Sequence, residues 1–211
     1  MKTDKLIELL AHDVRPVLSF RRTFWIAAVC GAAIAGLFFF SVVGIRPDFY
    51  SALRSGRFLL KFFITIPLAI GASGLAVTLA SPGARRGIWY SLVAFALVLL
   101  FGGVGFELWS LSPDMWKAKM IGHNAWFCLT LIPLLSLGPF ASLLSVLQLG
   151  APENPAGAGA TVGLAASAMA ATFYAANCDD DSPLFVLLWY PLATLPVMGT
   201  GWVLGRRYLS W

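Results

Sequence analysis

The 211-residue chain is strongly apolar: 59% of its residues are hydrophobic, 12% are charged, and its mean hydropathy is +0.80. Soluble domains carry about 25% charged residues, so this composition excludes a water-soluble globular enzyme and indicates a membrane protein. The net charge of +5 comes from basic residues at the edges of apolar runs, where lipid headgroups and the positive-inside rule account for them. No basic stretch is interleaved with aromatic residues, so direct binding of nucleic acid is not expected.

The first element in chain order is a short amphipathic helix within the N-terminal segment 1–22. Thr3 or Asp4 can cap this helix, and Pro16 must end or bend it. Its apolar side chains recur every three or four residues and form one stripe: Leu6, Leu9, Leu10, Val14 and Val17. A helix of about twelve residues is marginal alone in water. It is therefore expected to bind a surface, which is the membrane, the rest of the chain or the groove of a partner protein.

Six apolar stretches follow, and each is long enough to cross a bilayer as a helix of about 20 residues. They cover residues 24–43, 58–80, 88–106, 124–149, 157–178 and 184–205. Short connectors rich in proline, glycine and charge separate these stretches and end the helices. The sequence therefore predicts an all-α integral membrane protein, in which residues 23–211 form a domain of six transmembrane helices.

The lysine and arginine counts predict the orientation of these spans. An even number of spans puts both termini on one side, and that side holds nine Lys and Arg residues against six on the other. The arginine pairs at 21–22, 85–86 and 206–207 all lie on the side of the termini. Both termini are therefore expected to be cytoplasmic, and residues 179–181 are expected to face outward.

The fifth span carries a stripe of small side chains. They recur every four residues: Gly159, Gly163, Ser167, Ala171 and Ala175. Small residues on one face let helix backbones approach closely in lipid. The stripe predicts tight packing inside the six-helix bundle, with a dimerisation face as the alternative.

Two charged residues lie near the outer ends of spans. Lys61, in the second span, is expected to extend its ammonium to the membrane interface. Glu107, after the third span, is expected to pair with Lys117 or Lys119, or to meet water. No span has an acidic residue at its centre, so proton- or cation-coupled transport lacks its usual side chains.

The predicted topology brings two of the three cysteines to one membrane surface. Cys128 lies near the start of the fourth span and Cys178 ends the fifth. Thiolates with a nearby imidazole and carboxylate suit a thiophilic divalent metal, whose candidate ligands are Cys128, Cys178, His123 and Asp179. A reversible disulfide is the second interpretation, and simple packing of two small apolar side chains is the third. Cys30 has no polar neighbours in the first span and is assigned to packing.

The chain carries no recognisable enzyme motif. It has no phosphate-binding loop, dinucleotide fingerprint, zinc-protease motif or nucleophile elbow, so catalysis is not expected. The rival functions are a small transporter or channel, which lacks polar midplane positions, and a membrane thiol oxidoreductase, which lacks a Cys-x-x-Cys motif.

Several motifs resemble the NrsF family. They are the run 178–186 (CDDDSPLFV), Trp189-Tyr190, the closing 205–207 (GRR), 135–139 (LSLGP), 150–152 (GAP) and the opening 1–7 (MKTDKLI) with Leu10. The resemblance covers nearly the whole chain, and its most specific element is Cys-x-x-Asp-Ser-Pro-Leu-Phe. One departure is Asn177, which stands where that family is expected to carry a histidine beside the second cysteine.

The resemblance implies a function as well as a fold. NrsF proteins are six-span proteins of the bacterial inner membrane that are regarded as anti-sigma factors for extracytoplasmic-function sigma factors. Their cytoplasmic N-terminal segment, residues 1–22 here, is thought to hold the sigma factor. Their periplasmic cysteines, which map onto Cys128 and Cys178, are associated with sensing heavy-metal stress, so a transient heavy-metal ion is expected as the signal and no resident cofactor is expected.

Overall fold

The structure is a computed structural model that describes residues 19–81 and 83–209. Within this part it contains eight α-helices, one short π-helix and no strand, so the predicted all-α fold is confirmed. The predicted N-terminal helix, with Leu6, Leu9, Leu10, Val14 and Val17, lies outside the described residues.

Six of the helices are long and apolar enough to cross a membrane. They are α2 (Phe20–Phe38), which continues as the π-helix η1 (Phe39–Val43), α4 (Gly56–Leu79), α5 (Gly87–Ser110), α7 (Ala125–Leu147), α8 (Pro155–Ala175) and α9 (Pro183–Tyr208). The six predicted spans are confirmed, with ends that shift by a few residues. Two short helices were not predicted: α3 (Phe49–Ala52) and α6 (Pro113–Ile121).

Prolines and small polar caps explain where the later helices begin. Proline occupies the first turn of α6, α8 and α9, where its missing N–H would have no partner inside the helix. The Asn154 side chain accepts a hydrogen bond from the Gly157 N–H, and the Ser182 hydroxyl accepts one from the Leu184 N–H. These caps position the two loops that flank α8.

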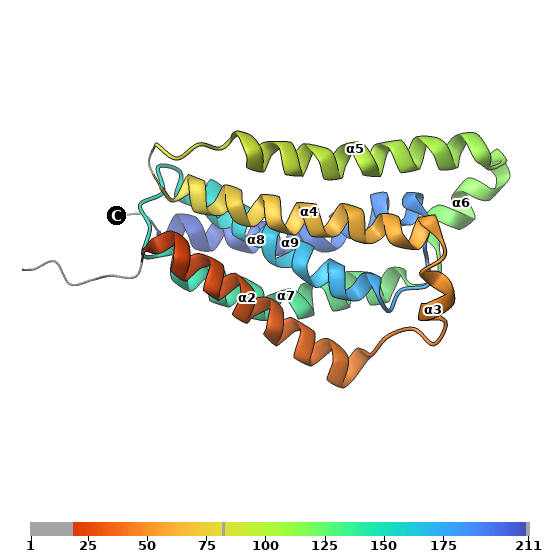
Figure 1. The fold of residues 1–211 in the computed structure, drawn as a ribbon, viewed down its shortest axis with the longest axis horizontal. Helices are drawn as coiled ribbons and strands as arrows, with labels where there is room; N and C mark the ends of the chain where they lie inside the picture. The colour runs from red at the N-terminus through yellow and green to blue at the C-terminus, as the bar shows by residue number, and fades with distance from the viewer. Residues whose placement is uncertain (1–18, 82, 210–211) are drawn as a thin grey trace, which may run out of the picture.

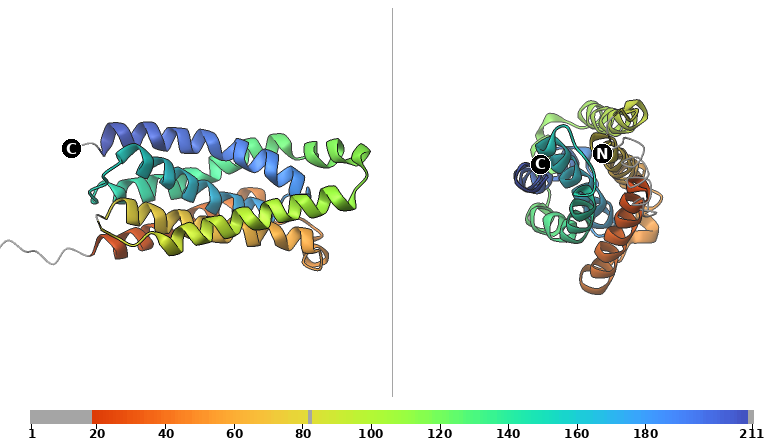
Figure 2. Two further views of the ribbon diagram at one scale, coloured as in Figure 1. Left: turned by 90° about the horizontal axis from the view of Figure 1, so that it is seen from above. Right: turned by 90° about the vertical axis from the view of Figure 1, so that its left-hand side faces the viewer.

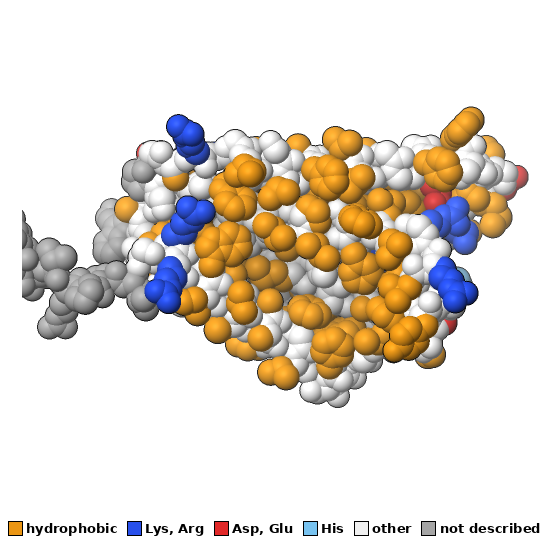
Figure 3. Space-filling model, viewed as in Figure 1, with side chains coloured by type: hydrophobic (Ala, Val, Ile, Leu, Met, Phe, Trp, Pro, Cys, Tyr) orange, Lys and Arg blue, Asp and Glu red, His pale blue; other side chains and the backbone are white. Residues whose placement is uncertain are grey.

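The long helices run side by side along the length of the molecule, and both ends of the described chain lie at the same end of the bundle (Figures 1 and 2). The short helices α3 and α6 lie at the other end, here called the distal end (Figure 1). A hydrophobic band covers the middle of the face in Figure 3, with Lys and Arg side chains toward its two ends. This distribution suits a bundle that crosses a lipid bilayer.

Helix α8 lies inside the bundle, where it packs against α4, α7 and α9. All five residues of its small-residue stripe are buried: Gly159, Gly163, Ser167, Ala171 and Ala175. A Cβ atom added to Gly159 would overlap the Gly201 carbonyl oxygen of α9, and one on Gly163 would lie 2.6 Å from the Val197 carbonyl oxygen. The two glycines therefore allow α8 and α9 to pack backbone to backbone.

This contact predicts that Gly159→Ala destabilises the protein. The added methyl group forces α8 and α9 apart, and overpacking of this kind costs about 1–3 kcal/mol. The matched control is Gly199→Ala, because a Cβ atom at that position of α9 meets nothing within 4 Å. Thermal unfolding of both variants in detergent measures the difference, and equal melting temperatures would contradict the packing.

Candidate functional site in the loop between α8 and α9

The loop of residues 176–182, which joins α8 to α9, holds the distal end of the bundle together. Its sequence supplies three consecutive carboxylates, Asp179 to Asp181, and the hydroxyl of Ser182. These groups bond to four other segments of the chain, which are the α2–α3 connection, α4, α5 and the connection between α6 and α7. We call these bonded groups and their partners the distal network.

The most buried part of the distal network is the ion pair between α4 and the loop. The Lys61 Nζ lies 2.6 Å from the Asp181 Oδ1, and it donates a hydrogen bond of 2.8 Å to the Cys178 carbonyl oxygen. The Lys61 residue is only 1% exposed. The prediction that Lys61 extends to the interface is therefore wrong, because its ammonium points inward to a carboxylate that compensates its lost hydration.

Arg46, which follows the end of the first span, binds the same Asp181 carboxylate. Its Nη1 lies 3.0 Å from the Asp181 Oδ2, and its other nitrogens bond both carboxylate oxygens of Asp48 at 2.6 Å. These hydrogen bonds hold the pKa of Asp48 below its ordinary value. In addition, the Arg46 N–H donates to the Ala176 carbonyl oxygen and the Asn177 amide donates to the Gly44 carbonyl oxygen, at 3.3 and 3.1 Å.

A second buried carboxylate joins α5 to the loop. The Ser182 hydroxyl donates a 3.0 Å hydrogen bond to the Glu107 Oε1, and the Arg57 Nε of α4 lies 3.0 Å from the Glu107 Oε2. The expected pairing of Glu107 with Lys117 or Lys119 is wrong. Glu107 is 1% exposed and faces the bundle, whereas both lysines lie on the exposed helix α6.

Asp180 fixes the start of α7. Its Oδ2 accepts hydrogen bonds from the backbone N–H groups of His123 and Asn124, at 2.8 and 2.7 Å. The Asn124 side-chain amide donates to Asp180 and also to Asp179. Gly122 precedes this turn with a φ of +61°, and a Cβ atom there would lie 2.5 Å from Phe185. The turn therefore requires glycine for both its backbone conformation and its space.

The two cysteines of interest lie in one buried hydrophobic cluster at the distal end. Cys128 and Cys178 are 0% and 1% exposed, and both pack in the cluster that contains Tyr174 and Phe185. Both are free thiols. Burial raises the pKa of the Cys178 thiol, although the Lys61 charge and the hydrogen bonds of the thiol with Tyr174 and with the Asp180 backbone act in the opposite direction. The thiol is therefore protonated near neutral pH, which makes it a weak nucleophile and metal ligand.

The other two predicted metal ligands point elsewhere. The His123 side chain is 95% exposed, with its Nδ1 3.7 Å from the Asp180 Oδ1, while Asp179 is bonded to Asn124. In the part of the chain that the structure describes, no three His, Cys, Asp or Glu side chains are grouped to hold an ion. This conformation therefore does not fit a resident metal held by Cys128, Cys178, His123 and Asp179.

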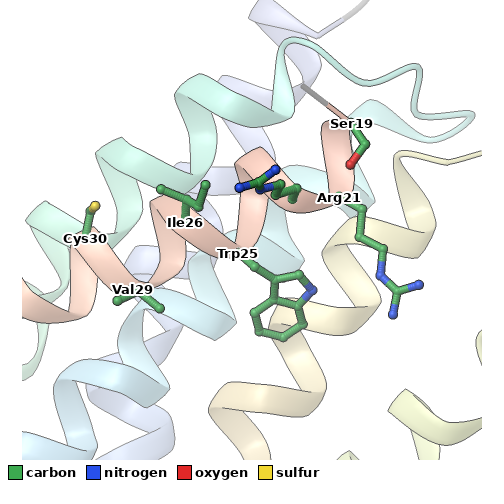
Figure 4. Close-up of a pocket in the computed structure, with 7 residues that line it drawn as sticks. Ser19, Arg21, Trp25, Ile26, Val29 and Cys30 are labelled. Atoms are coloured by element: carbon green, nitrogen blue, oxygen red, sulfur yellow. The ribbon is translucent and has the colours of Figure 1, made fainter. Parts of the chain in front are cut away.

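Cys30 is separate from the buried pair. It is an exposed residue of α2 and lines a surface groove together with Trp25, Ile26 and Val29 (Figure 4). Its assignment to internal packing is wrong, because this side of α2 faces away from the bundle core.

The distal network predicts that Lys61→Met destabilises the protein strongly. Removing one partner of a buried ion pair leaves the other carboxylate undercompensated, which costs about 3 kcal/mol or more. The control is Lys119→Met, since Lys119 is exposed on α6. Thermal unfolding in detergent compares the two variants, and a Lys61→Met protein as stable as the control would exclude an energetic role for the pair.

Comparison with known proteins places this arrangement in a family. The family described as "Negative regulator of sigma F" (NrsF) matches residues 10–211. The chain is 30% identical over 214 residues to "Probable anti-sigma-F factor NrsF" of Azospira oryzae. It is 31% identical over 219 residues to "Anti-sigma-F factor NrsF" of Caulobacter vibrioides. Both alignments cover each chain completely. No solved structure matches. The chain therefore belongs to the NrsF family of negative regulators of sigma F.

Proposed function

We propose that this chain holds an extracytoplasmic-function sigma factor at the bacterial inner membrane through its N-terminal segment 1–22, and releases it on a metal or oxidative signal at Cys128 and Cys178. The observation that carries the proposal is the full-length match to relatives named anti-sigma-F factors, in a chain with six helices of membrane-spanning length. Such a protein acts by binding its partner and needs no catalytic group.

The position of the thiols supports a role in sensing. The carbonyl oxygen of Cys178 accepts hydrogen bonds from both Lys61 and Arg46, so the backbone of this cysteine is part of the distal network. A disulfide or a bound thiophilic ion at Cys128 and Cys178 would change the side-chain position within a packed cluster. Because packed clusters tolerate little displacement, the change would strain the bonds of the loop 176–182.

The raised pKa of Cys178 sets the pH dependence of such a sensor. A metal binds the thiolate, so it must displace a proton that the buried thiol holds more firmly than an exposed thiol does. Metal binding therefore strengthens as the pH rises toward that pKa and weakens as the pH falls. His123 and Asp179 would join as ligands only after leaving their present positions.

Helix α2 supplies a physical connection between the two ends of the molecule. Its first residues, Phe20 to Arg22, are the end of the N-terminal segment 1–22, and its far end runs through η1 to Gly44 and Arg46, which bond to the loop 176–182. The signal must bind the releasing conformation more tightly than the holding one, with a coupling of about 1–3 kcal/mol. A shift of α2 relative to the bundle is the conformational change that we propose.

The first test concerns the segment that holds the sigma factor. Leu6→Asp or Leu10→Asp places a charge in any apolar partner groove, at a cost of several kcal/mol. Transcription from the sigma-dependent promoter should become constitutive, while immunoblots show normal amounts of the protein in the membrane fraction. Lys5→Ala is the control on the polar face of the same helix. Continued repression by the aspartate variants at normal protein levels would contradict the assignment.

The second test concerns the signal. Cys128→Ser and Cys178→Ser should each abolish release on addition of cadmium or an oxidant, yet leave repression in unstressed cells intact. Cys30→Ser is the matched control and should respond as the native protein does. Alkylation of the thiols before and after stress, read by gel shift, separates a disulfide from a bound ion. An unaltered response in the double serine variant would refute the sensor.

A further inference from the structure

A groove runs along the outer side of α2, from the end of the bundle where both ends of the described chain lie (Figures 1 and 4). Side chains four residues apart stack along an α-helix, so the groove is the space between two parallel ridges of one helix. An arginine begins each ridge. The groove is lined by Ser19 and by these ridges: Arg21, Trp25 and Val29 on one side, and Arg22, Ile26 and Cys30 on the other.

The far part of the groove is apolar and open to lipid. Ile26 and Val29 are 49% and 69% exposed on a helix of membrane-spanning length, and Cys30 is exposed as well. From Arg22 to Cys30 the helix rises about 12 Å, at 1.5 Å per residue. The hydrocarbon core of a bilayer is about 30 Å thick, so the groove stays within one leaflet. This length matches an acyl chain, whereas a spanning helix of a second copy needs a contact that continues into the other leaflet.

The mouth of the groove is positively charged. Arg21 and Arg22 are exposed, and no carboxylate of residues 19–81 and 83–209 lies within 4 Å of either guanidinium. A guanidinium group binds a phosphate through two parallel N–H groups. Two positive charges side by side favour a headgroup with a net negative charge over a zwitterionic one.

Trp25 lies between the charged mouth and the apolar part of the groove. Its ring packs against the ring of Trp89 from α5, with the ring centroids 6.0 Å apart, and this contact holds it in place. Tryptophan is enriched at the membrane interface because its ring is apolar and its N–H is polar. The order along α2 is therefore charge, tryptophan and hydrocarbon, which is the order of headgroup, ester region and acyl chain in a phospholipid.

We propose that this groove binds one anionic phospholipid of the leaflet at that end of the bundle. The headgroup phosphate accepts hydrogen bonds from Arg21 and Arg22, and one acyl chain lies between the two ridges as far as Cys30. A soluble partner has no access to the apolar part, because that part lies within the span. The bound lipid fixes the start of α2 at the membrane surface. The inference does not rest on the proposed function, because binding of the lipid needs no sigma factor and no signal.

Native mass spectrometry of the purified full-length protein in detergent tests the proposal. The protein is titrated with dioleoylphosphatidylglycerol, which is anionic, and separately with dioleoylphosphatidylcholine, which is zwitterionic. The native protein should retain one phosphatidylglycerol with a lower Kd than phosphatidylcholine has. Arg21→Gln combined with Arg22→Gln should raise the Kd for phosphatidylglycerol about 10-fold, because the charge-assisted hydrogen bonds to the phosphate are lost.

The matched control is Arg206→Gln combined with Arg207→Gln. This arginine pair lies in the last turn of α9, and Arg206 lies 5.7 Å from the centroid of the Trp202 ring, but neither arginine lines the groove. The control makes the same change in charge at the same end of the bundle and should keep the native Kd. Cys30→Phe fills the far part of the groove, so it should weaken the binding of phosphatidylglycerol while the preference over phosphatidylcholine remains.

Two further measurements make the result decisive. Because Arg21 and Arg22 are exposed, their double variant should have the native melting temperature without added lipid, so its weaker binding will not reflect unfolding. Glycerol phosphate, which has the phosphate but no acyl chain, should not displace the lipid. Equal Kd values for the two lipids, an equal loss of affinity in the control, displacement by glycerol phosphate, or a lipid-free mass of two protein chains would overturn the proposal.

Discussion

The buried ion pair between Lys61 and Asp181 is the interaction on which the distal end of this protein depends. A single ammonium at 1% exposure in an apolar bundle is unfavourable unless a carboxylate lies in direct contact, and Asp181 provides it at 2.6 Å. The ion pair therefore fixes the loop 176–182 against Lys61 of α4. Since Asp181 also bonds Arg46, the end of the first span is fixed to the same point. Because these bonds leave the loop little freedom to move, they also fix the positions of Cys178 and Ser182 within it.

The contact between α8 and α9 is made in a different way, because glycines without side chains let the two backbones approach closely. Gly159 and Gly163, in the first half of α8, bring this helix against the α9 backbone. Away from the distal end the bundle is therefore held by close backbone contact, and at the distal end by charge. Cys128 and Cys178 are packed like core residues, but the backbone of Cys178 belongs to the ion network. This makes the site a suitable place for a small chemical change to alter many bonds.

The sequence predicted much of the fold and only part of the site. The number, order and approximate ends of the six spans follow from apolar length, because a bilayer demands continuous runs of about 20 apolar residues. The sequence also indicated that Cys128 and Cys178 lie at the same end. It did not predict the partners of Lys61 and Glu107, because charge pairing across spans depends on which helices are neighbours.

The amino-acid sequence by itself determined that this is a six-span membrane protein of the NrsF family, since hydrophobic length and local motifs are properties of contiguous residues. Only the tertiary structure decided that Asp181 meets Lys61, that Glu107 meets Arg57, and that His123 stays exposed beside Asp180. These contacts join residues that are far apart in the chain, and the rotation of each helix about its axis selects them. That rotation is set by packing against all neighbouring helices together, which no local pattern encodes.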